Sequence, residues 1–288
     1  MKKALVIGLM ATVAVVMAAC GKEKSSDEGT TAGGETTGDA VVSEDNFEWD
    51  GNIITGLSEK GKEQKVLVIP EKCEGFRDGL FTGDEVDNAT QVSFESDEDI
   101  DIGLSLNFNS NLEKVELPEK LVLTGDEFFD FSACPSLKSI NIPAGVTEVP
   151  AYCFQGCEAL ENVEFEGNEV SIGMHAFERC SSLENISFPE SVPTIGEYAF
   201  WKCTSLKKVT LSKTVGAIGG SAFLQTGLNE LYIPSSVQIE PLSNYDTTAF
   251  LPADGHMISI YVVKDSWSDK NFDTLFDSVV FEKKYYEE

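Results

Sequence analysis

A 23-residue period in the apolar residues constrains this chain more than any other feature of its sequence. Phenylalanines recur at that interval as Phe131, Phe154, Phe177, Phe200 and Phe223. Cysteines lie three positions after the first four of these, and leucines three positions later again, at Cys134, Cys157, Cys180, Cys203, Leu137, Leu160, Leu183 and Leu206. An alternating apolar pair follows each leucine, which is typical of a β-strand. A fixed period in the twenties indicates a solenoid, in which each repeat buries its apolar face only against its neighbours.

The repeat extends beyond this regular stretch in both directions. Val66–Ile69 is the expected first strand and Ile258–Val263 the expected last one. Phe47–Leu57 contains two turn signals with glycine inside an apolar segment, which predicts a β-hairpin that caps the first repeat. Asp265–Phe276 has apolar residues at helical spacing and is followed by apolar Val279–Phe281, which predicts a C-terminal cap of helix and strand.

The first residues have the pattern of an export signal. Lys2 and Lys3 precede an apolar run that is shorter than a membrane-spanning helix usually needs, which favours cleavage of this segment as a signal peptide. The small residues Met17–Ala19 directly before Cys20 resemble the lipobox of bacterial lipoproteins, although Met17 stands where leucine is usual. That resemblance implies a diacylated Cys20 at the mature N-terminus, and an ordinary secretory signal is the alternative. Two acyl chains suffice for stable membrane anchoring.

These patterns divide the chain into five predicted segments. A tether rich in Ser, Thr, Gly and Glu separates the membrane anchor from the folded part, because it has almost nothing to bury. The segments are a signal peptide (1–19), a flexible tether that begins at lipidated Cys20 (20–45), an N-terminal β cap (46–64), a solenoid (65–263) and a C-terminal cap (264–288). The expected location is therefore the extracytoplasmic side of the cell envelope, at the cell surface.

Acidic residues dominate the charge of the chain. The sequence has 49 acidic and 21 basic side chains, and loss of Lys2 and Lys3 with the signal would leave 49 − 19 = 30 net negative charges. Such a surface repels nucleic acid and anionic headgroups and favours solubility. The charge therefore argues against a nucleic-acid partner, but it does not identify the partner.

The spacing of the cysteines favours buried free thiols. Cys134, Cys157, Cys180 and Cys203 occupy one repeat position, which Thr226 fills in the next repeat, between Phe and Leu. This environment suits a small buried hydrophobic residue. A disulfide bridge between neighbouring repeats is a weaker alternative, and a metal site is weaker still, because zinc needs four ligands that converge as a tetrahedron.

The segment Ile195–Leu211, with the sequence IGEYAFWKCTSLKKVTL, resembles the BspA-type (Treponema pallidum-type) leucine-rich repeat, I-G-x-x-A-F-x-x-C-x-x-L-x-x-I-x-I-P. The resemblance covers Val66–Pro234, with degenerate repeats around Phe81 and Phe108, and Ile258–Phe281 resembles the usual ending of the family. It implies an α/β-type leucine-rich-repeat solenoid with parallel strands and irregular or short helical turns. It also implies exported or surface proteins of bacteria and some protists that act in adhesion and partner binding, without catalytic residues.

Candidates for chemistry are few. His175 shares its repeat position with Tyr152 and Tyr198, which indicates a surface turn. Cys153, nearly one repeat before His175, occupies a position where other repeats have buried alanine. A nucleophile needs exposure and an orienting base, so we do not expect a Cys153–His175 pair. The acidic run Asp97–Asp101 lacks the glycine and glutamate of an EF-hand. We therefore expect no catalytic residue, metal site or cofactor, and a metal-dependent enzyme that uses this run is the least favoured alternative.

Two surfaces are candidates for binding. Side chains between the buried strand positions should point outward and form a mainly polar face, which solenoids use as an extended binding surface. Exposed aromatic residues can anchor protein partners or stack on sugars. The candidate residues are Asn141, Glu164, Asn185, Thr210 and Tyr232 on the strands, and Tyr152, His175, Tyr198 and Trp201 on the turns. The sequence thus predicts a non-catalytic surface lipoprotein that binds a host or envelope protein or a glycan, and a scaffold for envelope proteins is the alternative.

Overall fold

The structure is a computed structural model of the chain, which describes residues 43–77, 88–95, 111–121, 130–132, 134–237, 250–252, 254–276 and 280–288. The expected signal peptide, Cys20, most of the tether, Phe81, Phe108 and the acidic run Asp97–Asp101 lie outside these residues. The described residues belong to one compact unit, Ala40–Glu288.

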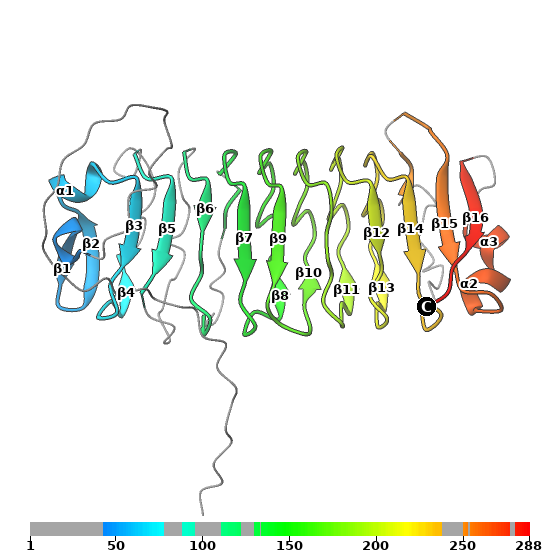
Figure 1. Cartoon of the computed structure of the whole chain (residues 1–288), viewed down its shortest axis with the longest axis horizontal. Helices are drawn as coiled ribbons and strands as arrows, with labels where there is room; N and C mark the ends of the chain where they lie inside the picture. Colours follow the sequence, from blue (N-terminus) through cyan, green and yellow to red (C-terminus); the bar gives the residue numbers. More distant parts are fainter. Residues whose placement is uncertain are drawn as a thin grey trace, which may run out of the picture. The chain divides into compact units, whose positions relative to one another are not determined.

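Parallel strands stacked along one axis form the main sheet of the solenoid (Figure 1). Its first part runs in the order β3 (Val66–Ile69), β5 (Gln91–Phe94), β6 (Lys114–Val115), β7 (Ser139–Ile142) and β9 (Asn162–Phe165). Its second part runs β12 (Lys208–Thr210), β14 (Glu230–Ile233), β15 (Ile258–Val262) and β16 (Phe281–Tyr285). A bridge between Asn185 and Lys208 connects the intervening coil to β12. The predicted parallel solenoid is therefore confirmed.

A second, narrower sheet runs beside the main one. It contains the two-residue strands β8 (Glu148–Val149), β10 (Ser171–Ile172), β11 (Thr194–Ile195) and β13 (Ala217–Ile218), all parallel. Paired residues such as Ile172 and Ile195 differ by one repeat. Between β5 and β14, the described residues of the coils form turns and strands and no helix. Helices lie only toward the two ends of the described chain.

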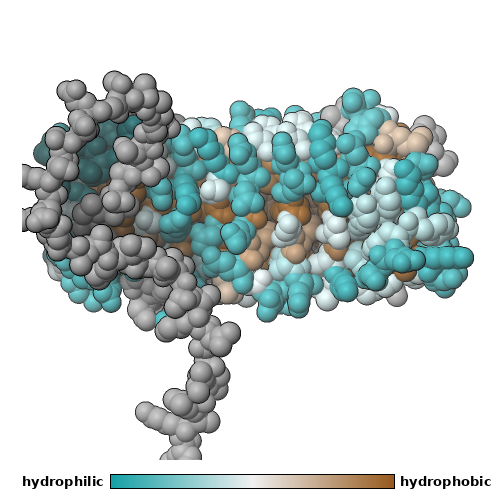
Figure 2. All heavy atoms as spheres, viewed as in Figure 1, coloured by the Kyte–Doolittle hydropathy of each residue, from teal (hydrophilic) through white to brown (hydrophobic). Residues whose placement is uncertain are grey.

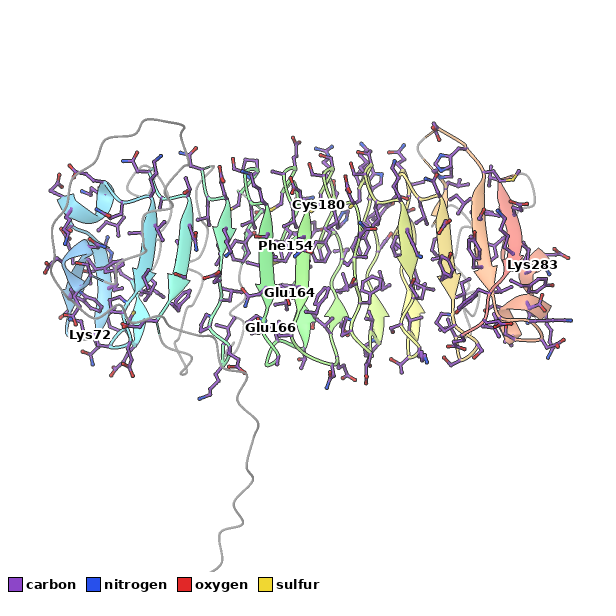
Figure 3. The ribbon with its side chains drawn as sticks, in the orientation of Figure 1. Lys72, Phe154, Glu164, Glu166, Cys180 and Lys283 are labelled. Carbon is purple, nitrogen blue, oxygen red and sulfur yellow. The ribbon has the colours of Figure 1, made fainter. Side chains whose placement is uncertain are left out.

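A column of stacked phenylalanine rings fills the interior on the side of the turns. Successive rings from Phe131 to Phe223 lie 5.1–5.4 Å apart and within 9° of parallel. The column continues to Phe250, whose ring lies 5.4 Å from that of Phe223. Figure 3 shows Phe154 within this interior. The predicted alignment of the five regularly spaced phenylalanines is confirmed, and the sixth ring is an addition.

The cysteine column is buried and its thiols are free, as the spacing favoured. The Sγ atoms of Cys157, Cys180 and Cys203 each donate to the carbonyl oxygen of a phenylalanine in the preceding coil, at 3.1–3.2 Å. Thr226, in the same repeat position, donates from its hydroxyl to the Phe223 carbonyl at 2.9 Å. This position therefore takes a small side chain that can also donate a hydrogen bond.

Both ends of the described solenoid are capped. β1 (Phe47–Asp50) and β2 (Ile53–Leu57) form the expected antiparallel hairpin, which continues to β4 (Gly75–Phe76) and lies with η1 (Glu44–Asn46) and α1 (Glu59–Lys62). At the other end the helical spacing produces two short helices, α2 (Trp267–Lys270) and α3 (Phe272–Leu275), separated at Asn271. The last strand, β16, begins at Phe281 and runs past the expected Val279–Phe281, of which Val279 lies outside the described residues.

Candidate binding surfaces

The strand face consists of the outward side chains of the main sheet from β6 to β16. Burial alternates along its strands, as in β7, where Ile140 and Ile142 are buried and Ser139 and Asn141 point out. A first row along the axis contains Lys114, Ser139, Asn162, Asn185, Lys208, Glu230, Ser259 and Glu282. A second row contains Glu116, Asn141, Glu164, Ser187, Thr210, Tyr232, Tyr261 and Lys284. Figure 2 shows this face as rows of hydrophilic side chains with hydrophobic surface between them.

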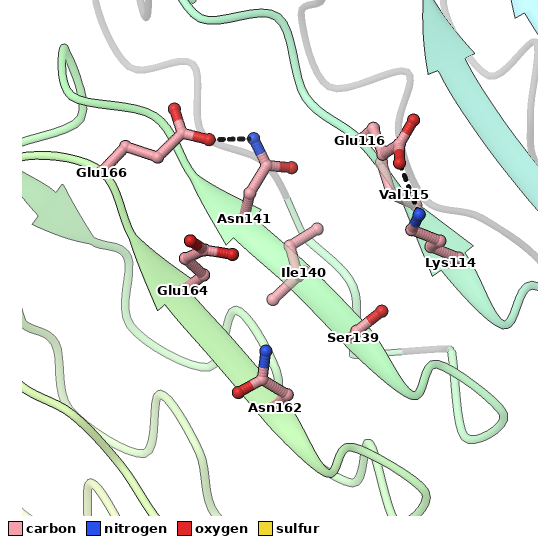
Figure 4. Close-up of a pocket in the computed structure, with 9 residues that line it drawn as sticks. All are labelled: Lys114, Val115, Glu116, Ser139, Ile140, Asn141, Asn162, Glu164 and Glu166. Carbon is pink, nitrogen blue, oxygen red and sulfur yellow. Dashed lines mark hydrogen bonds and ion pairs between the residues drawn. The ribbon is translucent and has the colours of Figure 1, made fainter. Parts of the chain in front are cut away.

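Asn141 has a structural role on this face. Its side-chain oxygen accepts from the backbone N–H of Leu117 at 2.9 Å, and its amide nitrogen donates to the Leu117 carbonyl at 3.2 Å. The same nitrogen donates to the Glu166 carboxylate at 2.9 Å (Figure 4). Since β6 ends at Val115, the Asn141 amide pairs with backbone groups that a longer strand would have paired. A ligand would have to compete with these bonds.

A hollow of about 470 Å³ lies on the strand face where β6, β7 and β9 meet. It is lined mainly by polar side chains, among them Ser139, Asn162, Glu164 and Glu166 (Figure 4). Lys114 and Glu116 form an ion pair at one edge of the hollow. Glu164, a predicted binding residue, is exposed there, and Figure 3 shows it on β9.

The other predicted residues of the face are accessible as expected. Asn185 and Thr210 are exposed, and Asn185 lines a second hollow of about 400 Å³ with Glu161 and Glu184. The alternation of the strands places Asn141, Glu164, Asn185, Thr210 and Tyr232 on one face, in neighbouring coils. The structure therefore brings these five together, whereas ligand binding by them stays a prediction.

Aromatic residues gather at the C-terminal end of the strand face. The rings of Tyr232 and Tyr261 stack at 4.3 Å, and Tyr286 meets Tyr232 edge-on at 5.3 Å. Lys208 lies 4.4 Å from the Tyr232 ring and Lys284 lies 5.9 Å from the Tyr261 ring. Burial, reinforced by the Glu230 carboxylate, raises the pKa of Tyr232 to about 12, so its hydroxyl remains a hydrogen-bond donor at neutral pH. Of this cluster, sequence reasoning selected only Tyr232.

The aromatic column on the turns consists of Tyr152, His175 and Tyr198. His175 is stacked between the two tyrosine rings at 4.9 Å from each, within 11° of parallel. Tyr152 is 42% exposed at the end of this stack. The three residues do share one position in successive coils, as the sequence indicated. His175 therefore covers one face of each tyrosine ring, which leaves less ring face for a ligand.

A buried glutamate fixes this column. Glu178 is 5% exposed, and its Oε2 lies 2.6 Å from Nδ1 of His175 and accepts from Nε2 of Gln155 at 2.7 Å. Trp201 meets Tyr198 at 5.5 Å and donates from Nε1 to Gln225 at 3.2 Å. Sequence reasoning missed Glu178, and its only signal was a glutamate directly after Phe177 in the turn.

The structure does not support thiol chemistry at Cys153. Its side chain is 1% exposed, and burial raises the pKa of the thiol well above its ordinary value, so it stays protonated at neutral pH. Nδ1 of His175 is engaged with Glu178. Among the described residues, no cluster of His, Cys, Asp and Glu could hold a metal ion, and no helix is long and apolar enough for a membrane span.

The repeats match a known family of leucine-rich repeats. Residues 128–249 match the BspA type leucine rich repeat region, in 6 copies. This stretch is a BspA-type leucine-rich repeat region. The resemblance expected from Ile195–Leu211 is thereby confirmed, and the BspA-type repeat provides a scaffold for binding.

Several solved structures are similar to this chain. The Treponema pallidum leucine-rich repeat protein is 22% identical, with 80% of this chain and 89% of that one covered and a TM-score of 0.40. The pneumococcal vaccine antigen PcpA is 14% identical, with 78% and 69% covered and a TM-score of 0.40. A leucine-rich repeat protein from Bacteroides ovatus is 21% identical, with 78% and 71% covered and a TM-score of 0.36. No curated protein matches the chain.

Proposed function

We propose that this protein is a lipid-anchored, non-catalytic binding protein on the extracytoplasmic side of the cell envelope. The observation that carries the proposal is the strand face, where polar side chains such as Glu164 and Thr210 are exposed in successive coils without contributing to the core. A solenoid that repeats such positions presents an extended surface to a partner. The lipobox-like ending at Cys20 supports a diacylglycerol anchor, and the polar segment after it supports a tether.

The partner of such a face is a protein or a glycan. Stacking on sugars, which exposed aromatic residues can provide, is less well supported at Tyr152, His175 and Tyr198, because part of their ring faces is used within the column. The exposed carboxylates, amides and hydroxyls of the strand face suit hydrogen bonds and ion pairs with a polypeptide. We therefore favour a protein partner at the strand face.

Two measurements on the full chain in its native envelope test this function. Labelled palmitate should be incorporated by the wild-type chain and not by a Cys20→Ser variant. Binding of the chain to arrays of host matrix proteins and glycans should be saturable. If the wild-type chain incorporates no label, the proposed lipid anchor is wrong. If the chain binds nothing on any array, the proposed host adhesion is wrong.

The alternatives predict different outcomes. A scaffold would retain envelope proteins of the same cell after mild solubilisation and would bind none of the host ligands. A metal-dependent enzyme would show turnover that Asp99→Asn abolishes, at an acidic run that lies outside the described residues.

A further inference from the structure

Charges on the strand face lie in bands along the solenoid axis. The coils of β9 and Asn185 carry exposed carboxylates and no basic side chain on this face or in the residues that directly flank it, at Glu161, Glu164, Glu166, Glu184 and Glu190. The next coil, that of β12, carries exposed Lys207, Lys208 and Lys213. Lys207 donates to the backbone carbonyl of Thr204 at 3.4 Å and makes no ion pair with any described carboxylate. An acidic band therefore adjoins a basic one, near the middle of the stretch from β6 to β16.

The hollow and the stacked tyrosines of the strand face are also separated along the solenoid axis. The larger hollow lies at β6, β7 and β9, whereas the stacked Tyr232 and Tyr261 lie on β14 and β15. In axial order the coils are β6, β7, β9, the Asn185 coil, β12, β14, β15 and β16. The hollow and the tyrosine pair thus lie on opposite sides of the boundary between the Asn185 coil and β12.

From this arrangement we infer that the partner of the strand face is a second copy of the chain. The two copies face each other about a two-fold axis that runs parallel to the strands, between the Asn185 coil and β12. An isologous contact of this kind requires a surface that is complementary to itself. The inference rests on the proposed function, because it takes the strand face to be a binding surface.

The two-fold axis reverses the order of the coils and keeps each row facing its equivalent. β6 then faces β16, β7 faces β15, β9 faces β14, and the Asn185 coil faces β12. The facing pairs of opposite charge are Lys114 with Glu282, Glu116 with Lys284, Glu184 with Lys207, and Glu190 with Lys213, each between the two copies. Within one chain Lys114 already pairs with Glu116, Lys284 with Glu282 and Lys213 with Glu288, so Glu184 with Lys207 is the pair in which neither described side chain has an ion pair in its own chain. Tyr232 faces Glu164 and Tyr261 faces Asn141, so the tyrosine pair meets the wall of the hollow.

The size of the face suits a weak dimer. With about 4.8 Å between strands, the face from β6 to β16 is about 34 Å long, and a strand of four residues makes it about 13 Å wide. Specific, stable interfaces bury about 1,200–2,000 Å² in total and weak ones less, so a face of this size fits a weak, reversible dimer. The net charge of −28 opposes association, although salt screens it beyond about 8 Å at physiological ionic strength. Like-charged Glu119 and Glu287 also face each other at the outer end.

Charge reversal at one facing pair tests this dimer. Two differently tagged full-length chains are co-expressed, extracted in non-ionic detergent at physiological salt, and the second chain captured through the first is measured. Glu184→Lys in both chains brings two lysines together, and Lys207→Glu in both brings two glutamates together. Each should reduce capture at least fivefold. A Glu184→Lys chain paired with a Lys207→Glu chain restores opposite charges at both contacts, so capture should recover to the wild-type value.

The matched control is Glu148→Lys on β8, which lies in the second sheet and should leave capture unchanged. Thermal unfolding of each variant checks its folding, and Glu190 with Lys213 provides a second pair if either variant unfolds. Equal capture by wild type and single variants, or no recovery in the mixed pair, would overturn the dimer. Array binding that persists in that case would leave the proposed binding function in place.

Discussion

At the scale of single residues, the turns require backbone conformations that most side chains avoid. His175, Tyr198, Arg179 and Lys202 all have positive φ, between 56° and 63°. These conformations point the backbone N–H groups along the axis, so that Arg179 donates to the Trp201 carbonyl at 2.8 Å and Lys202 to the Leu224 carbonyl at 3.0 Å. Gly156 occupies the equivalent position one coil before Arg179, with φ of 76°. The backbone strain is thus balanced by hydrogen bonds between coils.

Lys202 allows this strain to be measured. Lys202→Gly and Lys202→Ala both remove the side chain that lies over Trp201, but only glycine adopts positive φ without steric cost. We expect the glycine variant to be more stable than the alanine variant by about 1 kcal/mol. Urea unfolding of the two variants gives this difference directly. An alanine variant of equal or greater stability would show that φ at this position is not strained.

The buried thiols should make the fold sensitive to alkaline pH. Burial raises the pKa of Cys153, Cys157, Cys180 and Cys203 above the ordinary value of 9.0. Above pH 9 the unfolded chain loses these protons while the folded chain keeps them, so the free energy of unfolding falls as pH rises. Each thiol contributes a slope of up to about 1.4 kcal/mol per pH unit. Denaturant unfolding at pH 8, 9 and 10 measures the slope, which Cys203→Ala should make shallower.

At the scale of elements, the sequence was most informative where every repeat has the same length. The spacing from Phe131 to Phe223 predicted the stacked column, because rings one repeat apart must meet when the coils are equal. Phe250 escaped the period because it follows Phe223 after 27 residues, although Ala249 and Phe250 repeat the Ala-Phe pair of Ala176 and Phe177. The longer spacing interrupts the 23-residue period of the sequence, yet the Phe250 ring still stacks on the Phe223 ring.

Other elements depended on contacts that the period does not encode. Alternation correctly placed Glu164 and Thr210 on the outside, but it could not show that the Asn141 amide pairs with the Leu117 backbone. The expected strand after Leu183 is reduced to a bridge at Asn185. Pro189 does not account for this difference, because Pro143 and Pro234 hold the same position directly after the four-residue strands β7 and β14.

Close packing of neighbouring coils makes one glycine of an adjacent pair essential. A Cβ on Gly219 would lie 2.2 Å from the backbone nitrogen of Glu197 in the preceding coil, whereas a Cβ on Gly220 would meet only the Glu197 side chain, at 3.9 Å. Gly219→Ala should therefore destabilise the fold by at least about 1–3 kcal/mol, as overpacking does. Gly220→Ala is the control and should be close to neutral. Thermal unfolding distinguishes the two variants, and equal effects would contradict the close approach of the coils.

At the scale of the whole molecule, a change in one coil should destabilise mainly the adjacent coils, since each repeat contacts mainly its neighbours. Truncation of a central ring tests this behaviour. Phe177→Ala should cost about 3–5 kcal/mol, as expected for a buried aromatic residue. Native-state hydrogen exchange should show the largest loss of protection in the coils of Phe154 and Phe200 and the smallest toward β3. A uniform loss over all described coils would indicate a single cooperative globule.

The proposed binding surface requires that outward residues of successive strands form one straight row. Pairs of spin labels in a Cys20→Ser background can measure this row, because the six other cysteines are buried. Gln91 is separated from Lys208 by five strand steps and from Glu282 by eight.

At about 4.8 Å per step, labels at the nearer pair should lie about 24 Å apart and those at the farther pair about 38 Å apart. Distances that grow in this proportion would support a single row on one face. Similar distances for both pairs would contradict it, and with it the strand face as a binding surface.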